Sequence, residues 1–193
     1  MARIHGNGKG WVFTPKHFLD LGPRKSVDMA LARLRQAGTI RHLVRGLYDY
    51  PKQHPKIGLL SPSPDAVAQA IAKSEAIRLQ PSAAYAVNLL GLSRQVPAQI
   101  VYLTDGAEKI IEIGRQHIRL KRTTPKNMAT AGTTSGLVIQ AFRYLGKNGV
   151  TAAHIAHLQR TLSPDDREKL WQDRVHTPAW MHRPFDQIRG NGN

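Results

Sequence analysis

The sequence predicts an α+β protein, and three patterns in its 193 residues lead to this class. Apolar residues recur at helical spacing over residues 23–38, and two short runs of alternating apolar residues follow them around an Arg-Gly pair. The rest of the chain changes between helical and strand periods. The length suffices for one medium domain or for a small domain followed by a larger one, and we expect the second arrangement.

Two helices are expected at the start of the first module. Thr14 followed by Pro15 is typical of a helix start, because a hydroxyl can cap the first turn and proline fixes the backbone angle of the first helical position. Gly22 should end this short helix. An apolar stripe at helical spacing and a terminal glycine then predict the second helix, through Val27, Leu31, Leu34 and Gly38.

A strand pair should follow directly, over residues 39–44 and 47–50. Arg45 and Gly46 would form its tight turn, and Pro51 would stop it. Helix, tight turn, helix and two-stranded ribbon is the order of a winged helix-turn-helix. We therefore expect an N-terminal winged helix-turn-helix domain over residues 1–52.

The larger module should combine helices with a small antiparallel sheet. Residues 53–63 are rich in Pro, Lys and Ser, which predicts a linker. We expect the C-terminal α+β domain to span residues 64–188. Residues 189–193 are expected to be a disordered tail. Three strands over 99–104, 109–113 and 117–123 suit an antiparallel meander. Helices are expected from Pro64 to about Lys73, and over 81–90, 135–145, 152–162 and 164–175, the last capped by Ser163.

The charge of the chain points to a polyanion as partner. Lys and Arg number 28 against 13 Asp and Glu, the sequence pI is about 10.7, and residues 1–56 alone carry a net charge of +8. Cations favour phosphate polymers because binding releases condensed counterions. The alternative is a basic surface that only keeps the protein soluble.

Other classes of protein have weaker support. With no cysteine, disulfides and thiolate metal sites are excluded, and without a long apolar run we expect a cytoplasmic protein with no membrane contact. The glycines of H-G-N-G-K-G lack a preceding strand, and His154 and His157 lack further metal ligands nearby. Asp165 and Asp166 suit the first turn of a helix. We therefore expect no enzyme, no cofactor and no metal.

The candidate DNA-binding residues come from three places. If the apolar stripe of the second helix faces inward, its opposite face and N-terminal end are polar and basic, which suits a DNA groove as well as plain solvation. The first turn of the preceding helix could hold a phosphate, and the cations of the hairpin could reach the backbone. The candidates are Lys16, His17, Arg24, Lys25, Ser26, Met29, Arg33, Gln36, Arg41, His42, Arg45 and Gly46.

A family resemblance covers nearly the whole chain, from about Gly10 to about Arg183. The segments G-W-V-F-T-P-K-H-F-L-D-L-G and V-D-M-A-L-A-R-L-R-Q-A-G-T-I-R-H-L-V-R-G-L-Y-D-Y-P resemble AbiEi-type antitoxins of bacterial toxin-antitoxin systems. Later segments, such as V-P-A-Q-I-V-Y-L-T-D-G and L-S-P-D-D-R, are similar to an AbiEi-related family of uncharacterised bacterial proteins. Members often carry a longer basic helix before the first block. Here the alternatives are a short helix, a trimmed start, or a core completed by the C-terminal domain.

The resemblance implies an antitoxin. Its winged helix would bind operator DNA as a repressor, as a homodimer or as two monomers on an inverted repeat, and its C-terminal domain would counteract a nucleotidyltransferase-type toxin. By position, the recognition helix would be residues 24–37 and the wing residues 40–50. Three alternatives stay open: a toxin-masking interaction protein with secondary DNA binding, a transcriptional regulator unrelated to a toxin, and, least supported, an enzyme that reverses the modification made by the toxin.

Overall fold

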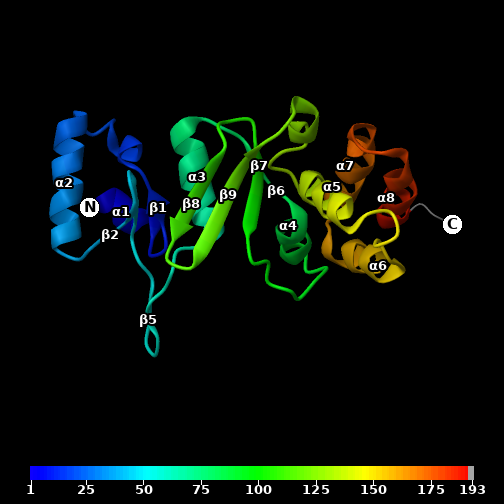
Figure 1. Cartoon of the computed structure of the whole chain (residues 1–193), viewed down its shortest axis with the longest axis horizontal. Coiled ribbons are helices and arrows are strands. Elements are labelled where there is room, and N and C mark those ends of the chain that lie inside the picture. Colours follow the sequence, from blue (N-terminus) through cyan, green and yellow to red (C-terminus); the bar gives the residue numbers. More distant parts are fainter. Residues whose placement is uncertain (191–193) are drawn as a thin grey trace. The chain divides into compact units, whose positions relative to one another are not determined.

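A computed structural model gives the fold and describes residues 1–190 (Figure 1). Helices combine with small sheets, which confirms the α+β class. The chain divides into two compact units, an N-terminal unit of residues 1–77 and 110–118, and a C-terminal unit of residues 78–109 and 119 onward. Over the part of the chain that is described, no helix has both the length and the apolar character needed to cross a membrane.

The N-terminal unit begins with helices around a three-stranded sheet. The strands have the order β1-β3-β2, and both pairs are antiparallel. The sequence did not predict the first helix or the first strand, because both are very short. In chain order the elements are α1 (Ala2–Asn7), β1 (Val12–Phe13), the 3-10 helix η1 (Pro15–Phe18), α2 (Arg24–Gln36), β2 (Arg41–Val44) and β3 (Leu47–Asp49).

The apolar stripe of α2 faces inward, as predicted. Val27 and Leu31 are 7% and 2% exposed, and they join a buried cluster that contains Ile4, Phe13 and Phe18. Full burial of such side chains contributes about 1.5–3 kcal/mol each. Ile4 is the one buried residue of α1. The unit therefore contains a short helix before β1, and one residue of this helix joins the core.

The β2–β3 hairpin turns at Arg45 and Gly46, as expected. Gly46 has a φ of 73°, in the left-handed region that favours glycine, and the space around it is open. Leu47 is buried, and Tyr48 stacks on Phe13 with ring centroids 6.1 Å apart, so both residues pack the hairpin onto the core. The register pairs Arg41 with Asp49, His42 with Tyr48 and Val44 with Leu47.

A buried ion pair fastens this hairpin. The side chain of Asp49 is 1% exposed and accepts from Nε of Arg41 at 3.0 Å and from Nη2 at 2.5 Å. The same Nη2 also donates to the backbone oxygen of Leu60 at 2.7 Å. Arg41 therefore connects β2, β3 and the chain that follows them.

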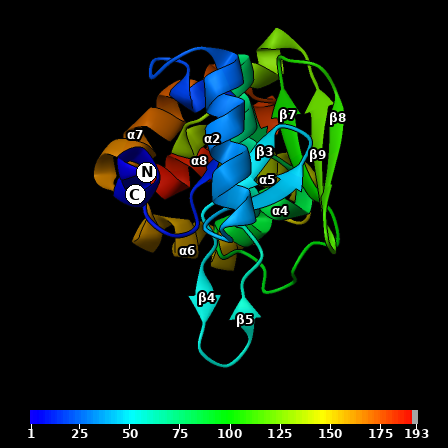
Figure 2. The ribbon, with the colours of Figure 1, turned by 90° about the vertical axis from the view of Figure 1, so that its left-hand side faces the viewer.

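The segment expected as a linker contains a small hairpin. Strands β4 (Gln53–His54) and β5 (Gly58–Leu59) pair antiparallel, and the amide of Leu60 donates to the oxygen of Lys52 at 2.9 Å at the base. The hairpin projects away from the helices of its own unit (Figures 1 and 2). Helix α3 (Pro64–Glu75) follows and is counted with the N-terminal unit.

A four-stranded sheet has the order β6-β7-β9-β8. The predicted meander is wrong, because β9 and not β8 lies next to β7, and the amide of Thr123 donates to the oxygen of Thr104 at 3.0 Å. Residues 105–108 therefore bridge two strand positions where a meander would have a tight turn. Strand β8 and the first residues of β9 are counted with the N-terminal unit. The elements are β6 (Leu79–Pro81), α4 (Ala83–Leu89), β7 (Ile100–Thr104), β8 (Lys109–Ile113) and β9 (Gln116–Arg122).

Helices complete the C-terminal unit and bury an apolar cluster. Phe142, Leu158, Leu170 and Phe185 in this cluster are 0% exposed. Ser163 caps α7 by accepting from the amide of Asp166, as predicted. The elements are η2 (Pro125–Met128), α5 (Thr134–Leu145), α6 (Ala152–Thr161), α7 (Pro164–Gln172), η3 (Asp173–His176), η4 (Ala179–Met181) and α8 (His182–Arg189).

The expected disordered tail, residues 189–193, is described only at its start. Arg189 is the last residue of α8, and Gly190 takes a left-handed conformation after it. Residues 191–193 lie outside the described residues. The helix α8 was not predicted from the sequence.

Replacing Asp49 with Asn should destabilise the N-terminal unit, because the guanidinium of Arg41 would lose its buried carboxylate. We expect a loss of about 2–3 kcal/mol, or roughly 5–10 °C in melting temperature, measured by thermal unfolding. Asp28→Asn is the matched control, since its ion pair with Arg24 is exposed and should contribute less than about 1 kcal/mol. Equal losses in the two variants would contradict a special role for the buried pair.

Candidate nucleic-acid interface

The exposed face of α2 carries most of the predicted DNA-binding residues. Opposite the buried stripe, Lys25, Met29, Arg33 and Gln36 are all exposed, and Met29 is 50% exposed. Ser26 is exposed beside them. The structure therefore gathers these predicted residues on one helix, on the side that the core leaves free.

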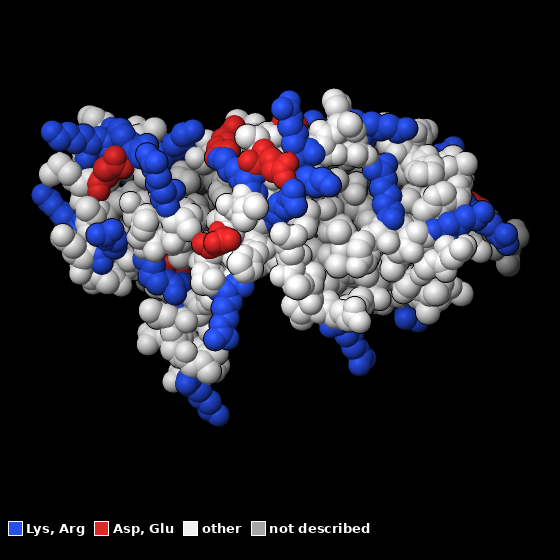
Figure 3. All heavy atoms as spheres, in the orientation of Figure 1, with Lys and Arg blue, Asp and Glu red and all other residues white. Residues whose placement is uncertain are grey.

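The cations of α2 differ in whether they have a partner. Arg24 pairs with Asp28 one turn later, with Nε 2.9 Å from the carboxylate. The side chains of Lys25, Arg33 and Arg35 make no hydrogen bond or ion pair within the described residues. Arg35 was not among the predicted residues, because it lies on the shoulder of the helix beside Asp28. Figure 3 shows Lys and Arg side chains spread over this unit.

The arginines of the β2–β3 hairpin differ in whether they bind other residues of the protein. The guanidinium of Arg41 donates to the carboxylate of Asp49 and to the oxygen of Leu60, so it is already hydrogen-bonded within the protein. His42 lies edge-on to Tyr48, with ring centroids 5.2 Å apart. Arg45 is exposed at the turn, and in the part of the chain that the structure describes its side chain has no partner. Arg45 is therefore the hairpin cation that is best placed for a phosphate.

Lys16 and His17 line a separate cavity of about 470 Å³ in the same unit. Its other walls come from α1, from α3 and from the chain at the start of β1, and they include Arg3, Trp11 and Lys73. Nζ of Lys16 donates to the oxygen of Ser74 at 2.8 Å. The cavity lining contains no carboxylate. A pocket with this lining suits an anionic group more than a cation.

The imidazole of His17 is held in a fixed position. Its Nδ1 accepts from the amide of Thr14 at 3.2 Å, which closes a capping box at the start of η1. Burial is the main cause that lowers the pKa of His17, and the charges of Lys73 and Arg3 lower it further. The side chain is therefore biased toward its neutral form, so the positive charge of this cavity comes from its lysines and arginine.

Sequence reasoning missed Arg3, Trp11 and Lys73 at this cavity. Arg3 binds the carboxylate of Asp20 with both terminal nitrogens at 2.6 Å, and it also donates to the backbone oxygen of His17. Lys73 comes from α3, far from η1 in the chain. Only a three-dimensional arrangement could bring these residues to Lys16.

Metal sites were not expected, and the candidate histidines have other roles. Nδ1 of His154 accepts from the amide of Thr151 as part of a helix cap, and Nε2 of His157 donates to the oxygen of Leu90. Among residues 1–190, no group of three or more His, Cys, Asp or Glu side chains is placed to hold a metal ion.

These observations define a basic α+β protein in which cations of α2 and of the β2–β3 turn are exposed and have no partner in the described residues. The chain belongs to a family of unknown function, DUF6088, whose match covers residues 1–170. A comparison with curated proteins gives no match. Among solved structures, the chain is similar to the crystal structure of the RV2827C protein from Mycobacterium tuberculosis, with 15% identity, a TM-score of 0.45, and coverage of 95% of this chain and 72% of that one. At this level the likeness carries no functional information.

The lowered pKa of His17 predicts a link to Lys73 and to pH. Lys73→Gln should raise the pKa of His17 in an NMR titration of its ring, because a nearby positive charge is removed. Lys25→Gln, in the same unit but on α2, should leave the pKa of His17 unchanged. An unchanged pKa of His17 in Lys73→Gln would show that Lys73 does not act on His17.

The same shift predicts how stability depends on pH. Because the folded pKa lies below the ordinary value of 6.5, the unfolded chain takes up this proton first as the pH falls. The contribution of His17 to stability is therefore complete above pH 6.5 and decreases below it.

Proposed function

We propose that the protein binds double-stranded DNA through its N-terminal unit, with the unit acting as a winged helix-turn-helix. In this proposal α2 is the recognition helix and the β2–β3 hairpin is the wing. The observation that carries the proposal is a group of exposed cations on α2 and at the hairpin turn that have no partner in the described residues, namely Lys25, Arg33, Arg35 and Arg45. A cation that is not neutralised inside the protein is available to a phosphate.

The order of elements supports the same proposal. A helix, a short strand, a 3-10 helix, α2 and a two-stranded ribbon follow one another within fifty residues, and one apolar cluster holds them together. An α-helix with an exposed polar face fits the width of the major groove. Ser26 and Gln36 on that face would supply hydrogen bonds to base edges, while Met29 offers an apolar contact to a thymine methyl.

The hairpin and the cavity at η1 would contact the DNA backbone. Arg45, at the turn, would reach a phosphate or the adjacent minor groove, with Gly46 allowing the turn and His42 beside it. Lys16 and His17 would meet a flanking phosphate at the edge of their cavity. Arg41 takes a supporting role, because its guanidinium already binds Asp49.

A titration of the promoter fragment upstream of the gene tests the proposal. Operator recognition usually uses two half-sites, so a dimer or two monomers on an inverted repeat are expected. Affinity should exceed that for random DNA and should fall steeply with added salt. Equal affinity for random DNA at every salt concentration, or no salt dependence, would overturn the operator claim.

Replacing the two arginines of the same hairpin should have different effects, one on DNA binding and one on stability. Arg45→Ala should weaken DNA binding and reduce the slope of log affinity against log salt by about one, without lowering the melting temperature. Arg41→Ala should lower the melting temperature, because it removes the partner of buried Asp49. If Arg45→Ala unfolds the unit and leaves the salt slope unchanged, the wing assignment fails.

We further propose an antitoxin role in the cytoplasm, which rests on the resemblance to AbiEi-type antitoxins. The winged helix would repress the operon, and the C-terminal domain would counteract a nucleotidyltransferase-type toxin. A nucleotidyltransferase-like reading frame next to the gene is the first expected observation. Its absence would leave a transcriptional regulator with an unrelated target.

Co-expression with such a toxin distinguishes direct masking of the toxin from indirect neutralisation. If the protein masks the toxin directly, the two should co-purify, and Arg45→Ala should still protect cells because the proposed DNA contact is in the other unit. Protection without any detectable complex would contradict direct masking. Removal of a nucleotide adduct from toxin-modified RNA by the purified protein would favour the enzyme alternative.

A further inference from the structure

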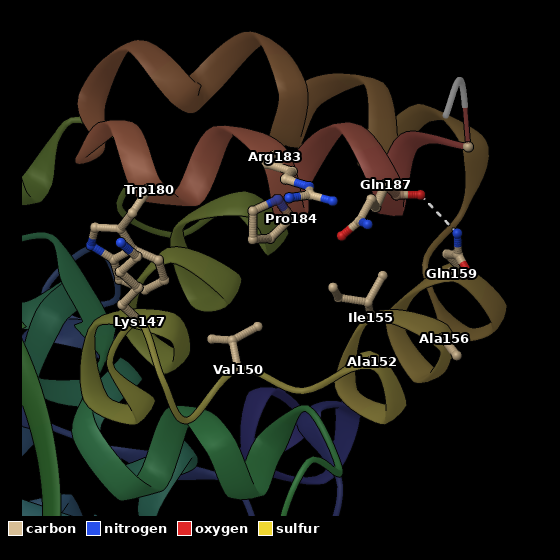
Figure 4. A pocket seen from close by; sticks show the side chains of 11 residues that line it. Lys147, Val150, Ala152, Ile155, Ala156, Gln159, Trp180, Arg183, Pro184 and Gln187 are labelled. Atoms are coloured by element: carbon tan, nitrogen blue, oxygen red, sulfur yellow. Dashed lines mark hydrogen bonds between the residues drawn. The ribbon is translucent and has the colours of Figure 1, made fainter. Parts of the chain in front are cut away.

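The C-terminal unit has a cavity that the proposed DNA-binding surface does not use. Its volume is about 750 Å³, and α6 and α8 form two of its walls (Figure 4). Pockets for small molecules commonly measure about 300–1,000 Å³. The cavity is therefore large enough for a ligand of the size of a mononucleotide.

The apolar wall of the cavity is part of the core. Val150, Ile155 and Trp180 line it, and all three pack against the buried cluster of this unit. Figure 4 shows Val150 and Ile155 directed toward the cavity from below α8, with Trp180 at one end. Because these side chains are held by the core, the indole presents a fixed, flat surface to a ligand.

The charged part of the lining is entirely positive. Lys147 and Arg183 line the cavity, and no Asp or Glu does. Both side chains are exposed, and neither has a hydrogen bond or ion pair within residues 1–190. Two unneutralised cations favour an anionic ligand, and the absence of a lining carboxylate argues against a metal ion or a cationic ligand.

Amide groups lie at the other end of the cavity. Nε2 of Gln159 donates to the backbone oxygen of Gln187 at 2.7 Å and so ties α6 to α8 (Figure 4). The side-chain amide of Gln187 remains unpaired in the described part of the chain. It can both donate and accept a hydrogen bond, as a sugar hydroxyl requires.

We infer that this cavity binds a nucleoside 5′-phosphate, either as a free nucleotide or as the terminal nucleotide of a single strand. Arg183 and Lys147 would bind the phosphate, Trp180 would stack on the base, and Gln187 at the other end would bond to a hydroxyl of the sugar. An acidic peptide would satisfy the two cations but would not combine a flat ring for the indole with a sugar hydroxyl for the amide. The inference does not depend on DNA binding by the other unit.

Calorimetric titration of the full chain tests the inference. The probes are the four ribonucleoside 5′-monophosphates, the matching nucleosides and inorganic phosphate. At least one monophosphate should bind about tenfold more tightly than its nucleoside and than phosphate alone, because both the charge and the ring contribute. No binding of any monophosphate, or equal affinity for nucleotide and nucleoside, would overturn the proposal, and so would equal affinity for nucleotide and inorganic phosphate.

Variants assign the binding to this cavity. Arg183→Gln should weaken nucleotide binding about tenfold, whereas Arg160→Gln, an exposed α6 residue outside the cavity lining, should not. Trp180→Leu should weaken nucleotides but leave inorganic phosphate unchanged, with circular dichroism as the control for folding. Unchanged affinity in Arg183→Gln would overturn the site.

A 5′-phosphorylated RNA oligonucleotide separates the two sources of the ligand. Tighter binding than the mononucleotide, lost in Arg183→Gln, indicates a nucleic-acid end, and equal binding indicates a free nucleotide. Promoter binding by the same variants is measured in parallel. Because Arg183 lies outside the proposed DNA-binding unit, loss of nucleotide binding with unchanged promoter binding separates this inference from the proposed function.

Discussion

The burial of Val27 and Leu31 against the aromatic cluster of β1 and η1 determines what the N-terminal unit can present to a partner. A helix has one apolar stripe, and once that stripe is buried, the orientation of every other side chain on the helix is set. Lys25, Met29 and Arg33 are outward because the stripe is inward. The position of the basic face is thus a consequence of packing, not an independent feature.

Electrostatics adds a second level of organisation to the same unit. Two arginines stabilise the fold through ion pairs, Arg3 with Asp20 and Arg41 with Asp49. Acidic residues are few in the first third of the chain, and within the described residues Lys25, Arg33, Arg35 and Arg45 have no hydrogen-bond or ion-pair partner. In the proposed complex with DNA, the polyanion would relieve the repulsion among these cations.

Local patterns predicted the elements that are long or have clear end signals. The stripe of α2, the turn at Gly46 and the cap at Ser163 were all predictable, because each depends on neighbours in the chain. The short elements α1 and β1 were not, since two to six residues give no measurable period. The strand order β7-β9-β8 was predicted wrongly, because period alone does not say which strands pair.

The candidate site shows the same limit. Sequence reasoning found the exposed residues of α2, but it could not see that Arg41 would be held by a buried Asp49, eight residues later on the paired strand. Similarly, the cavity at η1 needs Lys73 from α3, and the cavity of the C-terminal unit needs side chains from α6 and α8. Contacts between distant segments carry no signal in a single sequence.

The hairpin of β4 and β5 has a consequence for how this chain can change over evolution. Its base is closed by the bond between Leu60 and Lys52, and Arg41 holds the oxygen of Leu60. Beyond that closure, Gln53 to Leu59 are exposed or partly exposed. Lengthening a loop whose ends are already fixed costs little entropy. Residues 53–59 are therefore a place where insertions and deletions can accumulate in relatives while the core and the basic helix stay unchanged.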